Sequence, residues 1–123
     1  MEIANYRQFV FKLNRETKED KIVWNITEFS KPSLIGTEAI MDSVYVTNVL
    51  NNNIRLFRLK IKYFTEDYDY EWAESFRLEL IDDNGNSLYK IPDDPAISDL
   101  YDTVKFKTSK ISDLFNDFLK DPH

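Results

Sequence analysis

Residues 57–63 read Phe57-Arg58-Leu59-Lys60-Ile61-Lys62-Tyr63, a strict alternation of apolar and basic side chains. Successive side chains of a strand point to opposite faces of its sheet, so this pattern predicts a strand with one apolar and one charged face. The segment from about Tyr70 to Asp82 shows the same alternation, with apolar residues at Trp72, Phe76, Leu78 and Leu80. Two such neighbouring strands indicate an antiparallel sheet with one face on the core and one in water.

The basic residues Arg58, Lys60 and Lys62 allow two interpretations. The simpler one is cross-strand charge pairing, because the neighbouring strand carries Glu71 and Glu79. The other is a phosphate-binding role for the three basic side chains.

Three further strands complete a sheet of about five. Ile22, Trp24 and Ile26 alternate with less apolar residues, which predicts a half-buried strand. Residues 37–49 form a second candidate, in which Asp42 interrupts the apolar face and predicts a bulge or a strand start. Residues 51–53, all asparagine, predict a turn. Asn84-Gly85 predicts a type I′ hairpin that leads into a strand at residues 87–91.

Helices are predicted at both ends of the chain. Tyr6, Phe9, Val10 and Leu13 recur at the spacing of one helix face. Asp94 followed by Pro95 is typical of a helix start. Two apolar stripes follow, at residues 97–104 and 111–118. We expect two helices with a break near residues 106–109, although one long helix fits the stripes as well.

These elements predict a single α+β domain over residues 1–123. In it an antiparallel sheet of about five strands is covered on one face by the N-terminal helix and the C-terminal helix pair. The residues expected to face the helices are apolar: Trp24, Phe57, Leu59, Ile61, Phe76, Leu78 and Leu80.

The composition argues against most catalytic classes. The chain has no cysteine, its one histidine is His123, and its glycines are Gly36 and Gly85. We therefore predict no catalytic, cofactor-binding or metal-binding residues. A net charge of −6 argues against binding to nucleic acids and to anionic membranes. The N-terminal residues resemble no signal peptide and no stretch is apolar enough to span a bilayer, so we expect a cytoplasmic protein.

The segment from Thr65 to Glu74 combines acidic and aromatic side chains to an unusual degree for a connection. Tyrosine is enriched at protein interfaces, and acidic groups favour a basic partner surface. The segment is therefore a candidate partner-binding hairpin, unless it is a solvated loop whose tyrosines lie back over the sheet. Its candidate binding residues are Glu66, Asp67, Tyr68, Asp69 and Tyr70.

Several short motifs follow one another along the chain: Leu13, Thr17-Lys18, Lys21-Ile22-x-Trp24, Asp82-x-x-Gly85, Leu100-Tyr101 and Ile111-x-x-Leu114. In this order the chain resembles a widespread group of small bacterial and phage proteins with the signature Leu, then Thr-Lys-x-x-Lys-Ile-x-Trp. Many of those proteins have glycine where this chain has Asp20, a departure that affects only a turn. The resemblance implies a bacterial or phage origin and a helix–sheet–helix order. The group carries no established activity, so no site residues follow from it.

Three functions remain open, and the oligomeric state with them. The leading hypothesis is a non-enzymatic protein-interaction module, such as an immunity or antitoxin-like inhibitor or a phage antagonist of a host system. The second is a small-ligand or nucleotide-binding module. Its pocket is expected between sheet and helices, with tyrosines and Arg55, Arg58 or Arg77 as ligand-binding residues. The third is a carboxylate-dependent enzyme.

Overall fold

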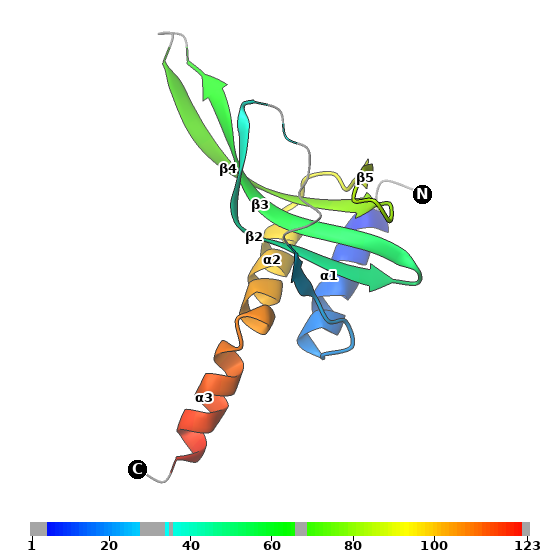
Figure 1. The fold of residues 1–123 in the computed structure, drawn as a ribbon, viewed down its shortest axis with the longest axis vertical. Helices are drawn as coiled ribbons and strands as arrows, with labels where there is room; N and C mark the ends of the chain where they lie inside the picture. Colours follow the sequence, from blue (N-terminus) through cyan, green and yellow to red (C-terminus); the bar gives the residue numbers. More distant parts are fainter. Residues whose placement is uncertain (1–4, 28–33, 35, 66–68, 122–123) are drawn as a thin grey trace.

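The computed structural model describes residues 5–27, 34, 36–65 and 69–121. It contains one antiparallel five-stranded sheet whose strands follow one another in chain order, together with three helices (Figure 1). The predicted α+β fold is therefore confirmed. The elements are α1 Asn5–Lys18, β1 Asn25–Thr27, β2 Glu38–Val49, β3 Asn52–Phe64, β4 Tyr70–Ile81, β5 Ser87–Lys90, α2 Pro95–Thr108 and α3 Ile111–Lys120.

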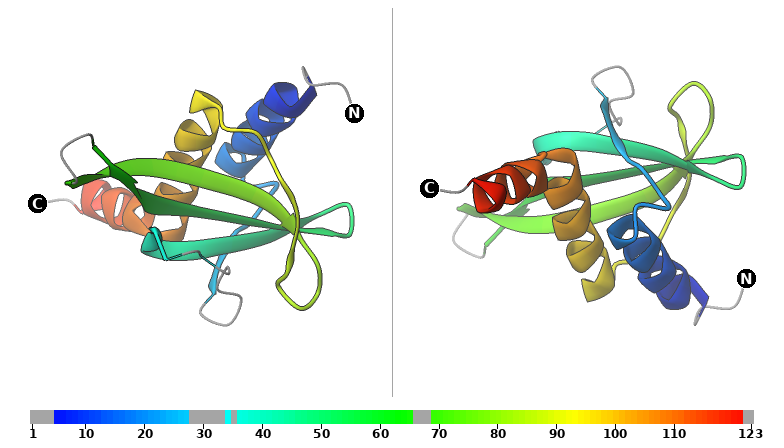
Figure 2. Two further views of the ribbon diagram at one scale, coloured as in Figure 1. Left: turned by 90° about the horizontal axis from the view of Figure 1, so that it is seen from above. Right: turned by 90° about the horizontal axis from the view of Figure 1, so that it is seen from below.

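Helices α1 and α2 lie on the same side of the sheet, the side seen from below in Figure 2. Their apolar faces and the facing strand residues form the main core. Its buried members are Val10, Leu13, Trp24, Tyr45, Ile54, Leu56, Leu78, Ile91, Ala96, Ile97, Leu100, Tyr101 and Val104.

A second, smaller cluster lies on the opposite face of the sheet and consists of Val44, Phe57 and Leu59, with Leu34, Ile40 and Ile61 packed against it. The prediction that Phe57, Leu59 and Ile61 face the helices is therefore wrong. The register pairs Leu56, not Phe57, with Leu78. Directly paired residues point to the same face, so the register places Leu56 under the helices and Phe57 on the far side.

Both connections that flank β3 and β4 differ in detail from the sequence prediction. The β2–β3 turn is centred on Leu50 and Asn51, whose φ angles are 50° and 66°. Asn52 already belongs to β3, so the turn lies one residue earlier than predicted. The hairpin before β5 is confirmed, but it is no type I′ turn, because Gly85 has a positive φ and Asn84 does not.

The two C-terminal helices are separate. Asp94 caps α2 by accepting a hydrogen bond from the Ala96 N–H at 2.9 Å, and it also binds Arg7 of α1 at 2.8 Å. Helix α2 ends at Thr108, and Lys110, with φ 60°, redirects the chain before α3. The break therefore consists of Ser109 and Lys110, at the C-terminal end of the predicted range 106–109. None of the helices in the described residues is long and apolar enough to cross a membrane.

Candidate interaction surfaces

Strands β3 and β4 continue past the helices as an arm, residues 60–65 and 69–74, at the top of Figure 1. The start of β2 pairs with the base of the arm at Lys60 and Ile61, and beyond Lys62 the described part of the arm has two strands. The arm is closed by a hydrogen bond of 2.8 Å from the Thr65 N–H to the Asp69 carbonyl. Most of its side chains are exposed on both faces. Ile61 packs against the smaller core cluster, and most other described side chains of the arm are exposed.

One face of the arm carries a ladder of aromatic rings. The ring centroids of Phe64 and Tyr70 are 6.4 Å apart, and those of Tyr70 and Trp72 are 6.1 Å apart. The Lys62 ammonium lies 3.8 Å from the Tyr70 centroid, and the Lys60 ammonium lies 4.6 Å from the Trp72 centroid. Such contacts are cation–π interactions. We call these five residues the aromatic face.

The position of Trp72 corrects a sequence expectation. Its alternation with charged residues indicated a core side chain, but Trp72 is 44% exposed. In the register it stands opposite Lys62, on the same face of the sheet that α1 and α2 cover further along. Among the described residues, neither buried cluster includes Trp72 or Lys62, so no described helix covers this face of the sheet at Trp72.

The predicted partner-binding residues are only partly described. Glu66, Asp67 and Tyr68 lie outside the described residues. Asp69 is exposed beside the arm's closing hydrogen bond, and Tyr70 is half exposed within the aromatic face. Their role in partner binding stays a prediction. The aromatic face adds Phe64 and Trp72, which sequence reasoning did not select as binding residues; for Trp72 the strand alternation indicated burial.

The basic residues of β3 have partners within the chain. Arg58 forms ion pairs with Glu74 at 2.5 Å and with Asp42 at 3.2 Å. Lys60 and Lys62 lie over aromatic rings instead of carboxylates. Charge pairing therefore explains Arg58, although its partners are not the glutamates expected from the sequence.

Asp42 sits in the predicted β-bulge and joins the sheet to α2. The register of β2 on β3 shifts between Met41 and Tyr45, and Asp42 has φ 63°. Its carboxylate lies 3.5 Å from the Lys105 ammonium and accepts a hydrogen bond of 3.4 Å from the Tyr101 hydroxyl. Partial desolvation acts to raise the pKa of Asp42, but Lys105 and Arg58 outweigh it and hold the pKa below its usual value. Burial, reinforced by Tyr45 and Asp42, raises the pKa of Tyr101.

We expect Asp42→Asn to lower the free energy of unfolding at neutral pH by less than about 1 kcal/mol, because exposed ion pairs are weak. The folded pKa of Asp42 is depressed, so its contribution is complete above the unfolded value of about 3.9 and is lost as pH falls through the folded value. The free energies of unfolding of wild type and variant, measured by urea denaturation, should therefore become equal at acidic pH. Asp102→Asn removes the same charge from an exposed position of α2 and is the control. A difference in free energy of unfolding between wild type and Asp42→Asn that stays constant at acidic pH would contradict the ion-pair assignment.

Helix α3 is amphipathic and has no buried residue. It continues from the end of α2 away from the sheet (Figure 1). Its polar residues Ser112, Asp113 and Asn116 line a groove that it shares with β1 and the end of α1. The opposite side is an apolar stripe, formed by Ile111, Leu114, Phe115, Phe118 and Leu119, which are between 37% and 80% exposed. The sequence pattern located this stripe but predicted that the sheet would cover it.

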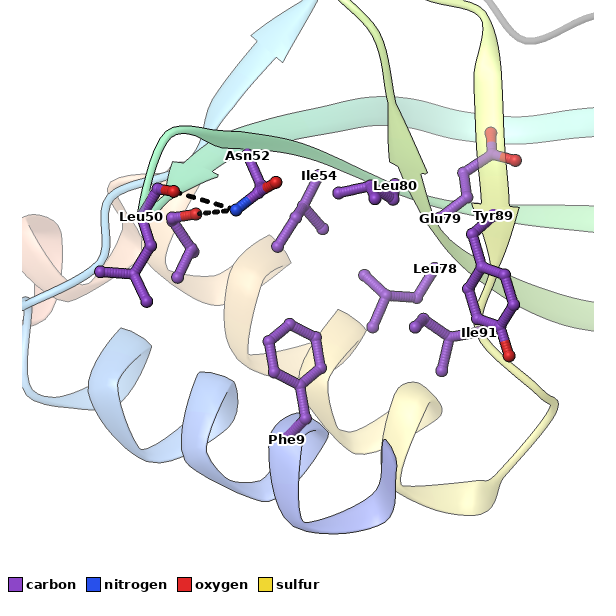
Figure 3. A pocket seen from close by; sticks show the side chains of 10 residues that line it. Phe9, Leu50, Asn52, Ile54, Leu78, Glu79, Leu80, Tyr89 and Ile91 are labelled. Carbon is purple, nitrogen blue, oxygen red and sulfur yellow. Dashed lines mark hydrogen bonds between the residues drawn. The ribbon is translucent and has the colours of Figure 1, made fainter. Parts of the chain in front are cut away.

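An apolar pocket of about 320 Å³ opens between α1 and the sheet (Figure 3). Phe9 of α1 stands opposite Leu78 and Ile91, and Leu50 forms its rim. The remaining lining residues are Val49, Asn52, Ile54, Glu79, Leu80 and Tyr89. The predicted pocket between sheet and helices has a counterpart here, with one tyrosine in its wall but none of the three predicted arginines.

The predicted ligand-binding arginines form ion pairs. Arg77 binds Glu38 at 2.6 Å, and Arg55 donates to Glu79 from Nε at 2.7 Å. Arg55 and Glu79 are 1% and 4% exposed, on the face of the sheet away from the helices. Ser87 donates to the second Glu79 oxygen at 2.8 Å. This buried network was missed by sequence reasoning, because charged residues at alternating positions indicate a wet face.

Within the part of the chain that the structure describes, no group of three or more histidine, aspartate or glutamate side chains is arranged to hold a metal ion. Comparison with protein-family models, curated proteins and solved structures gave no match to this chain. Function is therefore inferred from the surfaces of the chain itself.

Proposed function

We propose that this protein is a non-enzymatic protein-interaction module that docks on a partner through α3. The observation that carries the proposal is the apolar stripe of α3, which points away from the body while the polar side of the helix lines a groove. In an ordinary surface helix the apolar side faces the core. Exposed apolar patches of this kind mark interaction sites.

The length of α3 supports the same conclusion. An isolated helix of ten residues is marginal in water, because nucleation is costly and few hydrogen bonds follow it. Most helical stability in proteins comes from packing an apolar face. Since α3 buries no residue within its own chain, a partner that covers the stripe would supply that stability.

As the biological role we propose binding antagonism, either as an immunity or antitoxin-like inhibitor or as a phage antagonist of a host system. A small domain acts in this way by occupying a surface of its target, which requires no catalytic group. The net charge of −6 favours a target with a basic surface.

We expect the double variant Phe115→Ser, Phe118→Ser to lose a stoichiometric protein partner when tagged chains are purified from bacterial lysate and examined by native mass spectrometry. Both side chains are more than half exposed, so the free energy of unfolding of the isolated chain should change by less than about 0.5 kcal/mol each. Leu88→Ser, which removes an apolar side chain of 61% exposure from β5, is the matched control. Retention of the same partner by the double variant would refute docking through α3.

The apolar pocket supports a second candidate, binding of a small apolar ligand. Pockets that bind small molecules are concave and mostly apolar, as this one is. Thermal-shift titration with medium-chain fatty acids tests it, with Leu50→Asn as the rim variant, since asparagine tolerates the left-handed conformation found there. A rise in melting temperature with fatty acid that occurs in the wild type and is lost in the variant would favour ligand binding in the pocket. The absence of any rise in the wild type would rule out this candidate function.

A further inference from the structure

We infer that, in the protein without its target, α3 is covered by a second copy of this chain, in which the aromatic face of the arm receives the apolar stripe of α3. This inference rests on the proposed function, because it takes α3 as the docking element and names what covers it. It also provides a surface of matching chemistry for the aromatic face, which no helix among the described residues covers.

The first argument is the continuity of the helical layer. Helices α1 and α2 cover one face of the sheet as far as Phe76, which packs at the edge of the main core. The aromatic face continues that same side of the two strands, since Arg58 is paired with Phe76 and Lys62 with Trp72. A third amphipathic helix laid beside α2 would complete the layer over the bare strands.

The second argument is geometric. The arm and α3 extend toward opposite ends of the longest axis of the molecule, so α3 cannot reach the arm of its own chain (Figure 1). A two-fold axis perpendicular to that direction brings each α3 to the other chain's arm. The contact then occurs twice and closes the assembly, as in most homodimers.

The third argument is the match of size and chemistry. A ten-residue helix is about 15 Å long, and residues 60–64 of a strand span about 13 Å. Phe64, Tyr70 and Trp72 offer half-exposed rings to the apolar stripe. Lys60 and Lys62 lie among those rings, while Asp117 borders the stripe on α3, so opposite charges flank the two apolar surfaces.

Sedimentation equilibrium from micromolar to sub-millimolar concentration tests the dimer. We expect the wild type to dimerise, and we expect both Tyr70→Ala, Trp72→Ala on the arm and Phe115→Ser, Phe118→Ser on α3 to raise the dissociation constant at least about 100-fold. Phe11→Ser and Leu88→Ser remove equally exposed apolar side chains elsewhere and should leave it unchanged. A wild type that stays monomeric, or an arm variant that dimerises normally, overturns the inference.

Site-specific crosslinking tests which surfaces meet. The chain has no cysteine, so a chain with Asp69→Cys at the arm and a chain with Lys120→Cys at α3 each react at one place. After mixing and treatment with a bismaleimide, we expect the product between the two different chains to predominate. Predominance of the product joining two Lys120→Cys chains would mean that α3 pairs with itself and would overturn the inference.

These outcomes separate the inference from the proposed function. If the wild type is monomeric but a different protein co-purifies and is lost from the α3 double variant, the self-pairing is wrong and docking through α3 stands. If the α3 double variant changes neither the oligomeric state nor any co-purified partner, both are wrong.

Discussion

Glu79→Ala is expected to lower the free energy of unfolding by about 3–5 kcal/mol, the largest effect of any single charge removal considered for this chain. The substitution takes away the carboxylate to which the buried Arg55 guanidinium donates at 2.7 Å, while the hydrogen bond of 2.8 Å from Arg55 to the Gly85 carbonyl remains. It also removes the acceptor of the Ser87 hydroxyl. A buried cation that loses its carboxylate costs far more than an exposed one, because water no longer solvates it. Urea denaturation measures the difference.

Two controls separate burial from charge. Glu74→Ala removes an exposed partner of Arg58, and exposed pairs contribute no more than about 1 kcal/mol. The double substitution Arg55→Met, Glu79→Leu removes both buried charges and should recover most of the loss, since apolar replacements of buried ion pairs are often neutral or stabilising. If Glu79→Ala lowers the free energy of unfolding no more than Glu74→Ala does, the Arg55–Glu79 pair is not buried as the structure shows it.

Phe57→Ala is expected to cost about 3–5 kcal/mol, the usual range for truncation of a fully buried phenylalanine. Phe57 has no exposed surface, packs with Val44 and Leu59, and has the Arg77 guanidinium 5.7 Å from its ring centroid. The loss leaves a cavity on the face of the sheet opposite the helices. Chemical denaturation of the variant measures it directly.

A double-mutant cycle tests on which face Phe57 packs. Milder truncation by Phe57→Leu keeps the chain folded for the comparison. Combined with Leu100→Ala in the helix-side core, it should be additive within about 0.5 kcal/mol, because the two belong to different clusters. Combined with Val44→Ala, it should be non-additive, since those side chains share one cluster. The reverse pattern would place Phe57 under the helices after all.

Local patterns were sufficient for the element types. The Asp94-Pro95 helix start, the hairpin at Gly85, the bulge at Asp42 and the break between α2 and α3 are all confirmed. Each depends on backbone preferences or capping within a few residues, so the chain encodes it without reference to the rest of the fold. The turn at Leu50 escaped prediction because leucine rarely adopts a positive φ.

The faces of the strands could not be predicted in the same way. Residues 54–57 are buried on both sides of β3, since Ile54 and Leu56 meet the helices while Arg55 and Phe57 pack on the other face. Alternation therefore identifies two faces without identifying which one the helices cover. The pairing of β3 with β4 decides it, because a shift of one residue exchanges the two faces.

Periodicity and turn chemistry were enough to predict an α+β chain with an antiparallel sheet, a helix start at Asp94-Pro95 and an amphipathic final segment. Which apolar faces remain exposed depends on the tertiary structure. Strands β3 and β4 each extend about 40 Å, whereas the 14-residue helices α1 and α2 extend about 21 Å and leave the ends of the strands uncovered. Helix α3 starts after Lys110, a residue in the left-handed conformation that turns the chain away from the sheet. The aromatic face and the apolar stripe of α3 have the sequence pattern of a core, yet both are exposed. Burial depends on which elements meet in space, and amphipathic periodicity records only that a face is apolar.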